Sequence, residues 1–305
     1  MVVAAVVVLG ALSWFVVVLL PGWTAGGDVA RLPPAERLTA VGAVRTQWIT
    51  WTSVITGLGV GAYGVYRFYL DKDKQRLDQD KHLTGLFDSA TGRLESDDPT
   101  VRAGGLRTLF RLMTDSPRDH QPVVDTLCDV LRQRAADSAA GRLPRDVVAA
   151  ADALRDRPDR PEIRPVDLAG VRLPGVRWPG IRLPHADLGS VCLDGADLTG
   201  AVLTGADLAD ADLGKAKLAG VTAAGATLKN AVLTGADLSS ANLRDADLTR
   251  ARLQGATVPG ADFTGADLTD ADLRGVDLRT TTGLTGASLE RAVVDGDTVL
   301  PVAAR

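Results

Sequence analysis

The chain has 305 residues, of which 46% are hydrophobic and 24% charged, and its formal net charge is −4. This charge gives no overall attraction to nucleic acid, and the length allows more than one structural unit. The two cysteines, Cys128 and Cys192, lie in different predicted segments, so we expect no disulfide and a reducing compartment. Abundant alanine, valine, glycine and arginine are typical of a high-GC bacterial genome.

Two uncharged apolar stretches predict a membrane anchor over residues 1–70. Residues 2–20 are apolar throughout and approach the roughly 20 residues that a membrane helix needs. They lack the basic start of a secretory signal, although a cleaved signal peptide stays the alternative. Residues 46–66 are also uncharged and are bordered by Trp and Tyr, as at a membrane interface, with a buried or interfacial helix as the alternative. We therefore predict two transmembrane helices, about 2–20 and 46–66, joined by a loop.

Basic residues after the second stretch predict its orientation. Arg67, Lys72, Lys74, Arg76 and Lys81 follow it closely, whereas the loop before it carries fewer basic residues. The positive-inside tendency then places both termini in the cytoplasm and makes the protein a two-span protein of the cell membrane, with the lipid bilayer as a partner.

Residues 71–156 are predicted to form an α-helical module. Apolar residues keep helical spacing through most of the segment, and Asp98-Pro99 has the sequence of a helix N-cap followed by proline in the first turn. A break at Asp115-Ser116-Pro117 separates two of its helices, and the last helix starts near Leu143-Pro144. The next segment, 157–165, contains three prolines and is predicted to be a stiff linker.

A five-residue period runs without a slip from Val166 to Leu278, over 23 consecutive units. Each unit has an apolar centre, mostly Leu, preceded two places earlier by a small apolar residue, mostly Ala. This period fits neither an α-helix nor a regular strand, but it fits a coil that turns a corner every five residues. Four units then close a square coil of 20 residues, and the coils stack with a spacing of roughly 4.8 Å. Glycine recurs two places after many centres, as the corners require.

Units such as Ala196-Asp197-Leu198-Thr199-Gly200 and Ala241-Asn242-Leu243-Arg244-Asp245 resemble the A(D/N)LXX unit of pentapeptide-repeat proteins. The resemblance covers residues 166 to about 300. It implies a mainly β right-handed quadrilateral β-helix over 166–300, preceded by the α-helical module and the two membrane helices. The block 71–156 is similar to a helical module that precedes such repeats in bacteria, for which no activity is implied.

The residue before each centre points outward and provides the candidate interaction surface. Every fourth unit falls on the same wall, so one wall should be mainly acidic and other walls should mix charges. Between residues 166 and 305 there are 18 acidic and 13 basic residues. The candidate residues on this surface are Asp167, Asp187, Asp207, Asp247, Asp267, Arg172, Arg177 and Arg182.

No motif in the sequence indicates catalysis. The three histidines are scattered, no Cys or His lies at metal-ligand spacing, and no nucleophile elbow or phosphate-binding loop occurs. We therefore predict no catalytic residue, cofactor or metal. The sequence favours a non-enzymatic, membrane-anchored scaffold that binds an unidentified protein at the cytoplasmic face, without direct nucleic-acid contact and with homo-oligomers left open.

Two alternatives are kept. The acidic wall is compatible with a DNA-mimicking modulator of DNA gyrase or topoisomerase, a role that some pentapeptide-repeat proteins have. An enzyme site between the helical module and the first coil is the other alternative, with Arg172, Arg177 and Arg182 as anion ligands.

Overall fold

The computed structural model describes residues 31–135 and 143–301. Its helices are α4 (Pro34–Leu94), α5 (Pro99–Asp115), α6 (His120–Arg134), α7 (Arg145–Arg155) and α8 (Gly286–Glu290). The β-helix lies between α7 and α8 in the chain. The chain divides into two units, residues 1–81 and 82–305.

The helix α4 is 61 residues long and extends from the first unit into residues 82–94 of the second. It already begins at Pro34, so residues 34–47 are helical where the sequence predicted a loop. Its polar hydroxyls do not interrupt the helix, because Thr50 and Ser53 donate to the carbonyls of Thr46 and Ile49 one turn earlier.

Among the helices that the structure describes, none combines the length and apolar character needed to cross a membrane. The predicted transmembrane helix at 46–66 lies within α4 and is not supported. Its threonines, serine and glycines dilute the apolar residues, which is the physical reason for the difference. The predicted helix at 2–20 lies outside the described residues.

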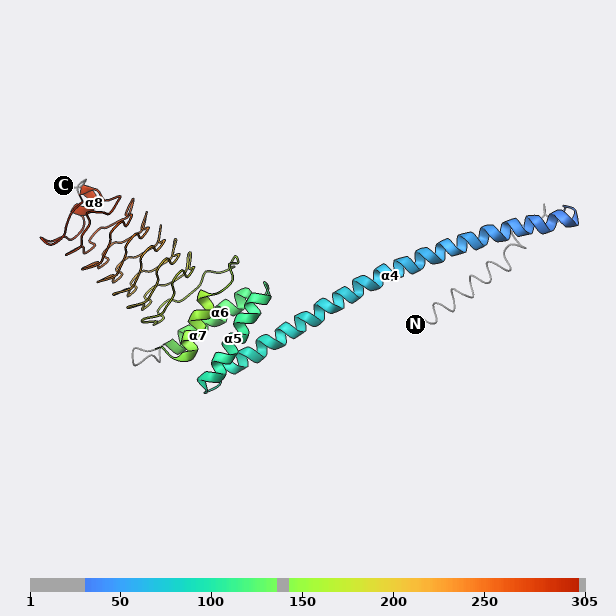
Figure 1. Ribbon diagram of the computed structural model, residues 1–305, viewed down its shortest axis with the longest axis horizontal. Coiled ribbons are helices and arrows are strands. Elements are labelled where there is room, and N and C mark those ends of the chain that lie inside the picture. Colours follow the sequence, from blue (N-terminus) through green and yellow to red (C-terminus); the bar gives the residue numbers. More distant parts are fainter. Residues whose placement is uncertain (1–30, 136–142, 302–305) are drawn as a thin grey trace. The chain divides into compact units, whose positions relative to one another are not determined.

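Helices α5, α6 and α7 form a small bundle in the second unit (Figure 1). The predicted cap is confirmed, since the Asp98 side chain accepts a hydrogen bond of 2.7 Å from the Thr100 N–H. Their apolar faces meet in one core that contains Leu109, Leu127 and Leu154, all fully buried. Ala90, near the end of α4, also belongs to this core.

Residues 166–282 form a stack of square coils (Figure 1). Parallel bridges join residues 20 apart, so each coil has 20 residues and every fourth unit stacks on the same wall, as predicted. Each wall contributes one bridged residue between two-residue turns rather than a longer strand. The hydrogen bonds alternate in direction: Leu168 N–H donates to the Asp187 carbonyl at 2.8 Å, and Asp187 N–H donates to the Val166 carbonyl at 2.9 Å.

The interior of the β-helix is filled by the two inward columns of each wall. The Leu column and the Ala column are almost completely buried, with Leu198 1% and Ala201 0% exposed. Burying one leucine side chain stabilises the fold by about 1.5–3 kcal/mol, and alanine leaves room for the opposite leucine. The repetition of these two residue types therefore builds the core.

Both ends of the stack are covered. At the first coil, Trp178 replaces the usual leucine, is fully buried, and donates from Nε1 to the Ala151 carbonyl of α7 at 2.9 Å. At the last coils the bridge interval grows from 20 to 21 and 22 residues, since Asp272 pairs with Val293 and Asp277 with Val299. The extra residues hold the short helix α8, whose Leu289 is buried.

Candidate functional site

The predicted acidic column lies on one wall, which we call the acidic wall. Parallel bridges connect consecutive members of this column across the coils, with Thr227 in the place of a sixth carboxylate. The column from the first to the last coil consists of Asp167, Asp187, Asp207, Thr227, Asp247 and Asp267. The sequence therefore located these five carboxylates correctly.

These aspartates also stabilise the corners of the coil, a role that the sequence interpretation missed. In each case one carboxylate oxygen accepts a hydrogen bond from the N–H two residues further on, as between Asp207 and Ala209 at 3.0 Å. The bond from Thr249 N–H to Asp247 is 2.9 Å long. Asn242 accepts from Arg244 N–H in the same way. Asp and Asn favour such turns, so the second position of the A(D/N)LXX unit has a local structural cause.

The same turn bonds hold several wall carboxylates in their charged form. The Thr264 hydroxyl and N–H lower the pKa of Asp262 to about 2. The hydroxyl of Thr269 lowers the pKa of Asp267, and Thr199 does the same for the pKa of Asp197. Hydrogen bonds to the ionised oxygen favour the charge, so these walls stay negative at neutral pH.

The three candidate arginines are not brought together. Arg172, Arg177 and Arg182 belong to one coil but bridge to Cys192, Asp197 and Val202, which places them on three different walls. Arg182 is ion-paired with Asp159. The hypothesis that these three side chains form one anion site is therefore wrong, because consecutive repeat units point in different directions around the square.

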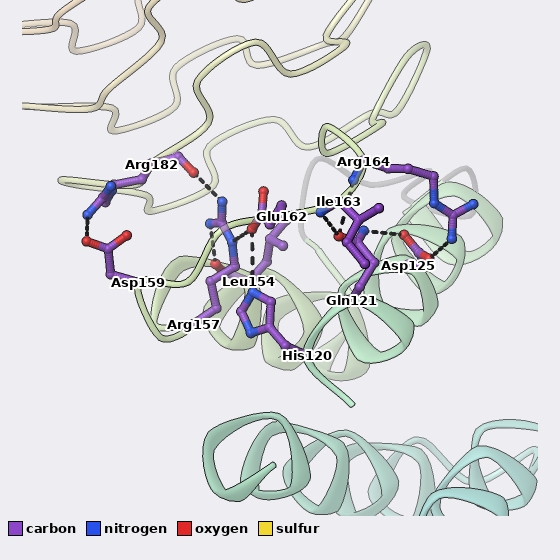
Figure 2. A network of polar contacts seen from close by, with 10 residues as sticks. All are labelled: His120, Gln121, Asp125, Leu154, Arg157, Asp159, Glu162, Ile163, Arg164 and Arg182. Atoms are coloured by element: carbon purple, nitrogen blue, oxygen red, sulfur yellow. Dashed lines mark hydrogen bonds and ion pairs between the residues drawn. The ribbon is translucent and has the colours of Figure 1, made fainter. Parts of the chain in front are cut away.

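Instead, the charged groups between helices and coil centre on Arg157 (Figure 2). Its side chain is only 6% exposed and pairs with Glu162 at 2.6 Å. It also donates to the Leu154 carbonyl at the end of α7 and to the Arg182 carbonyl of the first coil. One guanidinium thus links the last helix, the linker and the β-helix, with its fork of donors used in three directions.

His120 lies beneath this arrangement, with Nε2 3.8 Å from the Glu162 carboxylate. It is buried, and neither ring nitrogen has a hydrogen-bond partner among the described residues. Burial lowers the pKa of His120, although Glu162 acts in the opposite direction. The ring is therefore held neutral near physiological pH.

A second set of contacts attaches the linker to α6 (Figure 2). The Gln121 side-chain oxygen accepts a hydrogen bond from Ile163 N–H at 2.8 Å, and its amide nitrogen donates to Asp125. Asp125 in turn forms an ion pair with Arg164. These contacts hold the linker against α6.

A hollow of about 570 Å³ lies between the linker and the first coil, lined by Arg155, Arg157, Arg160, Arg164 and Arg182 among others. These five arginines are all engaged. Arg160, for example, donates to the carbonyls of Met113 and Thr114 at the end of α5. The hollow consequently offers no convergent set of free donors of the kind that an oxyanion or phosphate requires.

The two cysteines lie in different environments. Burial raises the pKa of the Cys128 thiol to about 12, so this cysteine is protonated and unreactive at neutral pH. Cys192 is half-buried, with Sγ 4.0 Å from an Asp212 oxygen. Within residues 31–135 and 143–301, no group of three His, Cys, Asp or Glu side chains is arranged to hold a metal ion.

The comparisons with known proteins concern the repeat region. The family model of pentapeptide repeats matches in eight copies, over residues 166–200, 181–220, 211–250 and 246–282. The search of curated proteins found no match.

Several solved structures are similar. HetL from the cyanobacterium Nostoc sp. strain PCC 7120, a pentapeptide repeat protein involved in heterocyst differentiation regulation, is 26% identical over 46% of this chain and 77% of its own, with a TM-score of 0.20. Rfr23 from the cyanobacterium Cyanothece 51142 is 26% identical over 44% and 90%, with a TM-score of 0.22. Full-length QnrB1, a plasmid-mediated fluoroquinolone resistance protein, is 20% identical over 47% and 76%, with a TM-score of 0.27.

The family match and the 20-residue coils agree on the same part of the chain, and they place its charged side chains on the walls of a right-handed β-helix. Residues 166–282 of this chain therefore form a pentapeptide-repeat domain.

Proposed function

We propose that the protein is a non-enzymatic scaffold that binds another protein on the acidic wall of its β-helix. The observation that supports this proposal is the column of five carboxylates on six successive coils, interrupted once by Thr227, whose positions are fixed by backbone bridges and turn hydrogen bonds. A partner segment with basic side chains at a similar spacing gains charge-assisted contacts without ordering the column first. The engaged arginines around the hollow argue against the alternative of an enzyme at the first coil.

Affinity capture from the host tests this proposal. Asparagine at Asp187, Asp207, Asp247 and Asp267 removes the charge and keeps the turn bond, as Asn242 does in the native chain. We expect the bound partner to be lost with this variant but retained when Asp197, Asp237 and Asp277 of another wall are changed to asparagine. Recovery of the same proteins with both variants would contradict binding at the acidic wall.

Attachment to a membrane is a separate part of the proposal. It is supported by the uncharged sequence 2–20 and by exposed apolar side chains of α4, among them Trp51, Leu58, Tyr66 and Phe68. Fractionation of host cells distinguishes the outcomes. We expect the protein in the membrane pellet after a high-salt wash and its release after deletion of 2–20; a wild-type chain that stays in the supernatant without detergent would end this part.

The acidic wall also favours a second candidate, a modulator of DNA gyrase or topoisomerase that imitates the charge of duplex DNA. Basic residues on the remaining walls make the negative field weaker than that of DNA. A supercoiling assay with purified gyrase decides this point: inhibition that disappears in the asparagine variant supports the modulator, and unchanged supercoiling at micromolar protein excludes it.

A further inference from the structure

One corner of the β-helix differs from the other three in the residues that occupy its last position. From residue 170 to residue 275, the last residue of each corner has a positive φ, a conformation in which glycine is least strained. Nine residues other than glycine adopt it within the described part of the β-helix, and five of them are stacked in a single corner. These five, with φ between 56° and 59°, are Ser190, Asp210, Asn230, Arg250 and Asp270.

Glycine fills most positions in the other three corners, so five successive polar side chains in this corner are a departure from the repeat. Asp and Asn tolerate this conformation, whereas Ser190 and Arg250 adopt it against their usual preference, and the five side chains are linked only weakly to each other. Asn230 donates to Asp210 at 3.0 Å, and Arg250 Nε lies 3.7 Å from Asp270 with both side chains 63% exposed. Strained positions that persist are common where side chains are needed for contacts outside the element itself.

The wall next to this corner carries both charges, and we call it the mixed wall. Its bridged column is Arg172, Cys192, Asp212, Val232, Arg252 and Asp272. The corner on its other side contributes Asp194, Gly214, Thr234, Gln254 and Arg274. Arg252 is exposed and has no ion pair within the described residues, whereas Val232 lies in the middle of the column and is half-buried.

We propose that the mixed wall binds the same wall of a second copy of the chain, with the two β-helices antiparallel. The two-fold axis lies in the interface plane, at the level of Val232 and perpendicular to the axis of the β-helix. This axis reverses the order of the coils and keeps each column opposite the same column of the second copy. It then places Asp212 opposite Arg252 of the second copy, and Arg252 opposite Asp212 of the second copy. This association does not depend on partner binding at the acidic wall.

The same axis makes the flanking columns complementary. Asp210 faces Arg250 of the second copy, and Asp194 faces Arg274 of the second copy. Asn230, Val232 and Thr234 face their own copies along the axis, and none of the three is charged. The pattern thus gives three opposite-charge pairs on each half of the interface and no like-charge pair in these three columns, which is the self-complementarity that a two-fold interface requires.

The other walls do not show this property. On the acidic wall, every antiparallel alignment that overlaps three or more coils places carboxylates opposite each other, as with Asp207 and Asp247. The wall with Arg177 and Asp277 gives at most two opposite-charge pairs, and the wall with Arg182 gives one. The mixed wall is therefore the favoured face for self-association.

The size of this wall predicts a weak dimer. Five coils at strand spacing are only about 20 Å tall, so the contact area is below that of a standard stable interface. We expect a concentration-dependent equilibrium in which opposite charges select the partner and its orientation.

Charge reversal on full-length protein tests the proposal by sedimentation equilibrium. Wild type is expected to dimerise reversibly as its concentration rises. Arg252→Asp and Asp212→Arg should each raise the dimer dissociation constant at least about tenfold, because each creates two like-charge pairs. An equimolar mixture of the two variants should recover dimers, since both pairs are then opposite in charge. Far-UV circular dichroism confirms that each variant is folded.

Cross-linking gives a second measurement that locates the axis. In a Cys192→Ser background, Val232→Cys should form a covalent dimer with a short bis-maleimide, because residue 232 faces itself. Thr227→Cys, on the acidic wall of the neighbouring unit, serves as the matched control and should stay monomeric. A wild type that is monomeric at all concentrations, reversal variants that dimerise like wild type, or equal cross-linking at 227 and 232 would each overturn the proposal.

Discussion

Replacing Trp178 by alanine is expected to separate the helical module from the β-helix. The indole is fully buried in the first coil, and its Nε1–H donates to the Ala151 carbonyl of α7 at 2.9 Å. Truncation of a buried tryptophan to alanine costs about 3–5 kcal/mol, including the cavity that remains. The lost hydrogen bond adds about 1 kcal/mol. We therefore expect a total loss of about 4–6 kcal/mol in the free energy of unfolding.

Two variants separate these contributions. Trp178→Phe keeps most of the apolar packing and removes the donor, so it should cost about 1 kcal/mol or slightly more. Leu198→Ala changes the same column one coil further on and should cost about 2–5 kcal/mol. The second variant makes a cavity of the same kind but removes no bond to α7.

Urea denaturation followed by circular dichroism gives the free energies, and hydrogen exchange of the α7 amides reports the contact itself. Exchange in α7 should accelerate in Trp178→Ala and stay near the wild-type rate in Leu198→Ala under native conditions. If α7 exchanges equally in the two variants, and Trp178→Phe is as stable as wild type, the indole does not hold the helix to the first coil.

Three further results are expected. Arg157→Ala should lower the free energy of unfolding by about 3 kcal/mol, because Glu162 is left buried without its cation. Arg182→Ala removes one partner of an exposed ion pair and should cost less than about 1 kcal/mol. Equal losses in urea denaturation would contradict this difference. Asp247→Ala should cost about 1 kcal/mol through loss of the turn hydrogen bond from Thr249, whereas Asp247→Asn should cost almost nothing. A thermal melt in which the asparagine variant is less stable than the alanine variant would refute the role of Asp247 in the turn. The melting temperature should fall as the pH drops below the ordinary histidine pKa of 6.5, because burial lowers the pKa of His120 in the folded chain and the unfolded chain therefore binds the proton first. This pH dependence should be smaller in His120→Gln. A fall of the same size in both proteins would show that other groups cause it.

The segment 46–66 shows that the absence of charge is not sufficient to identify a transmembrane helix. The absence of charge over 46–66 predicts a transmembrane helix, but the residues continue as part of a helix from Pro34 to Leu94 and are not apolar enough to span a membrane. Thr50 and Ser53 fit in a helix because their hydroxyls bond to the preceding turn, so a lack of charge does not by itself distinguish the two cases.

What the sequence determined by itself was everything that repeats: the 20-residue coil, the buried Leu and Ala columns, and the wall on which each aspartate lies. These follow from local chemistry that is the same in every unit, so one unit predicts the others. Tertiary structure alone decided the contacts that occur once, namely Trp178 against α7, the buried Arg157 between helix, linker and coil, and the separation of Arg172, Arg177 and Arg182. Such contacts join residues far apart in the chain, and no period in the sequence specifies which side chains will meet.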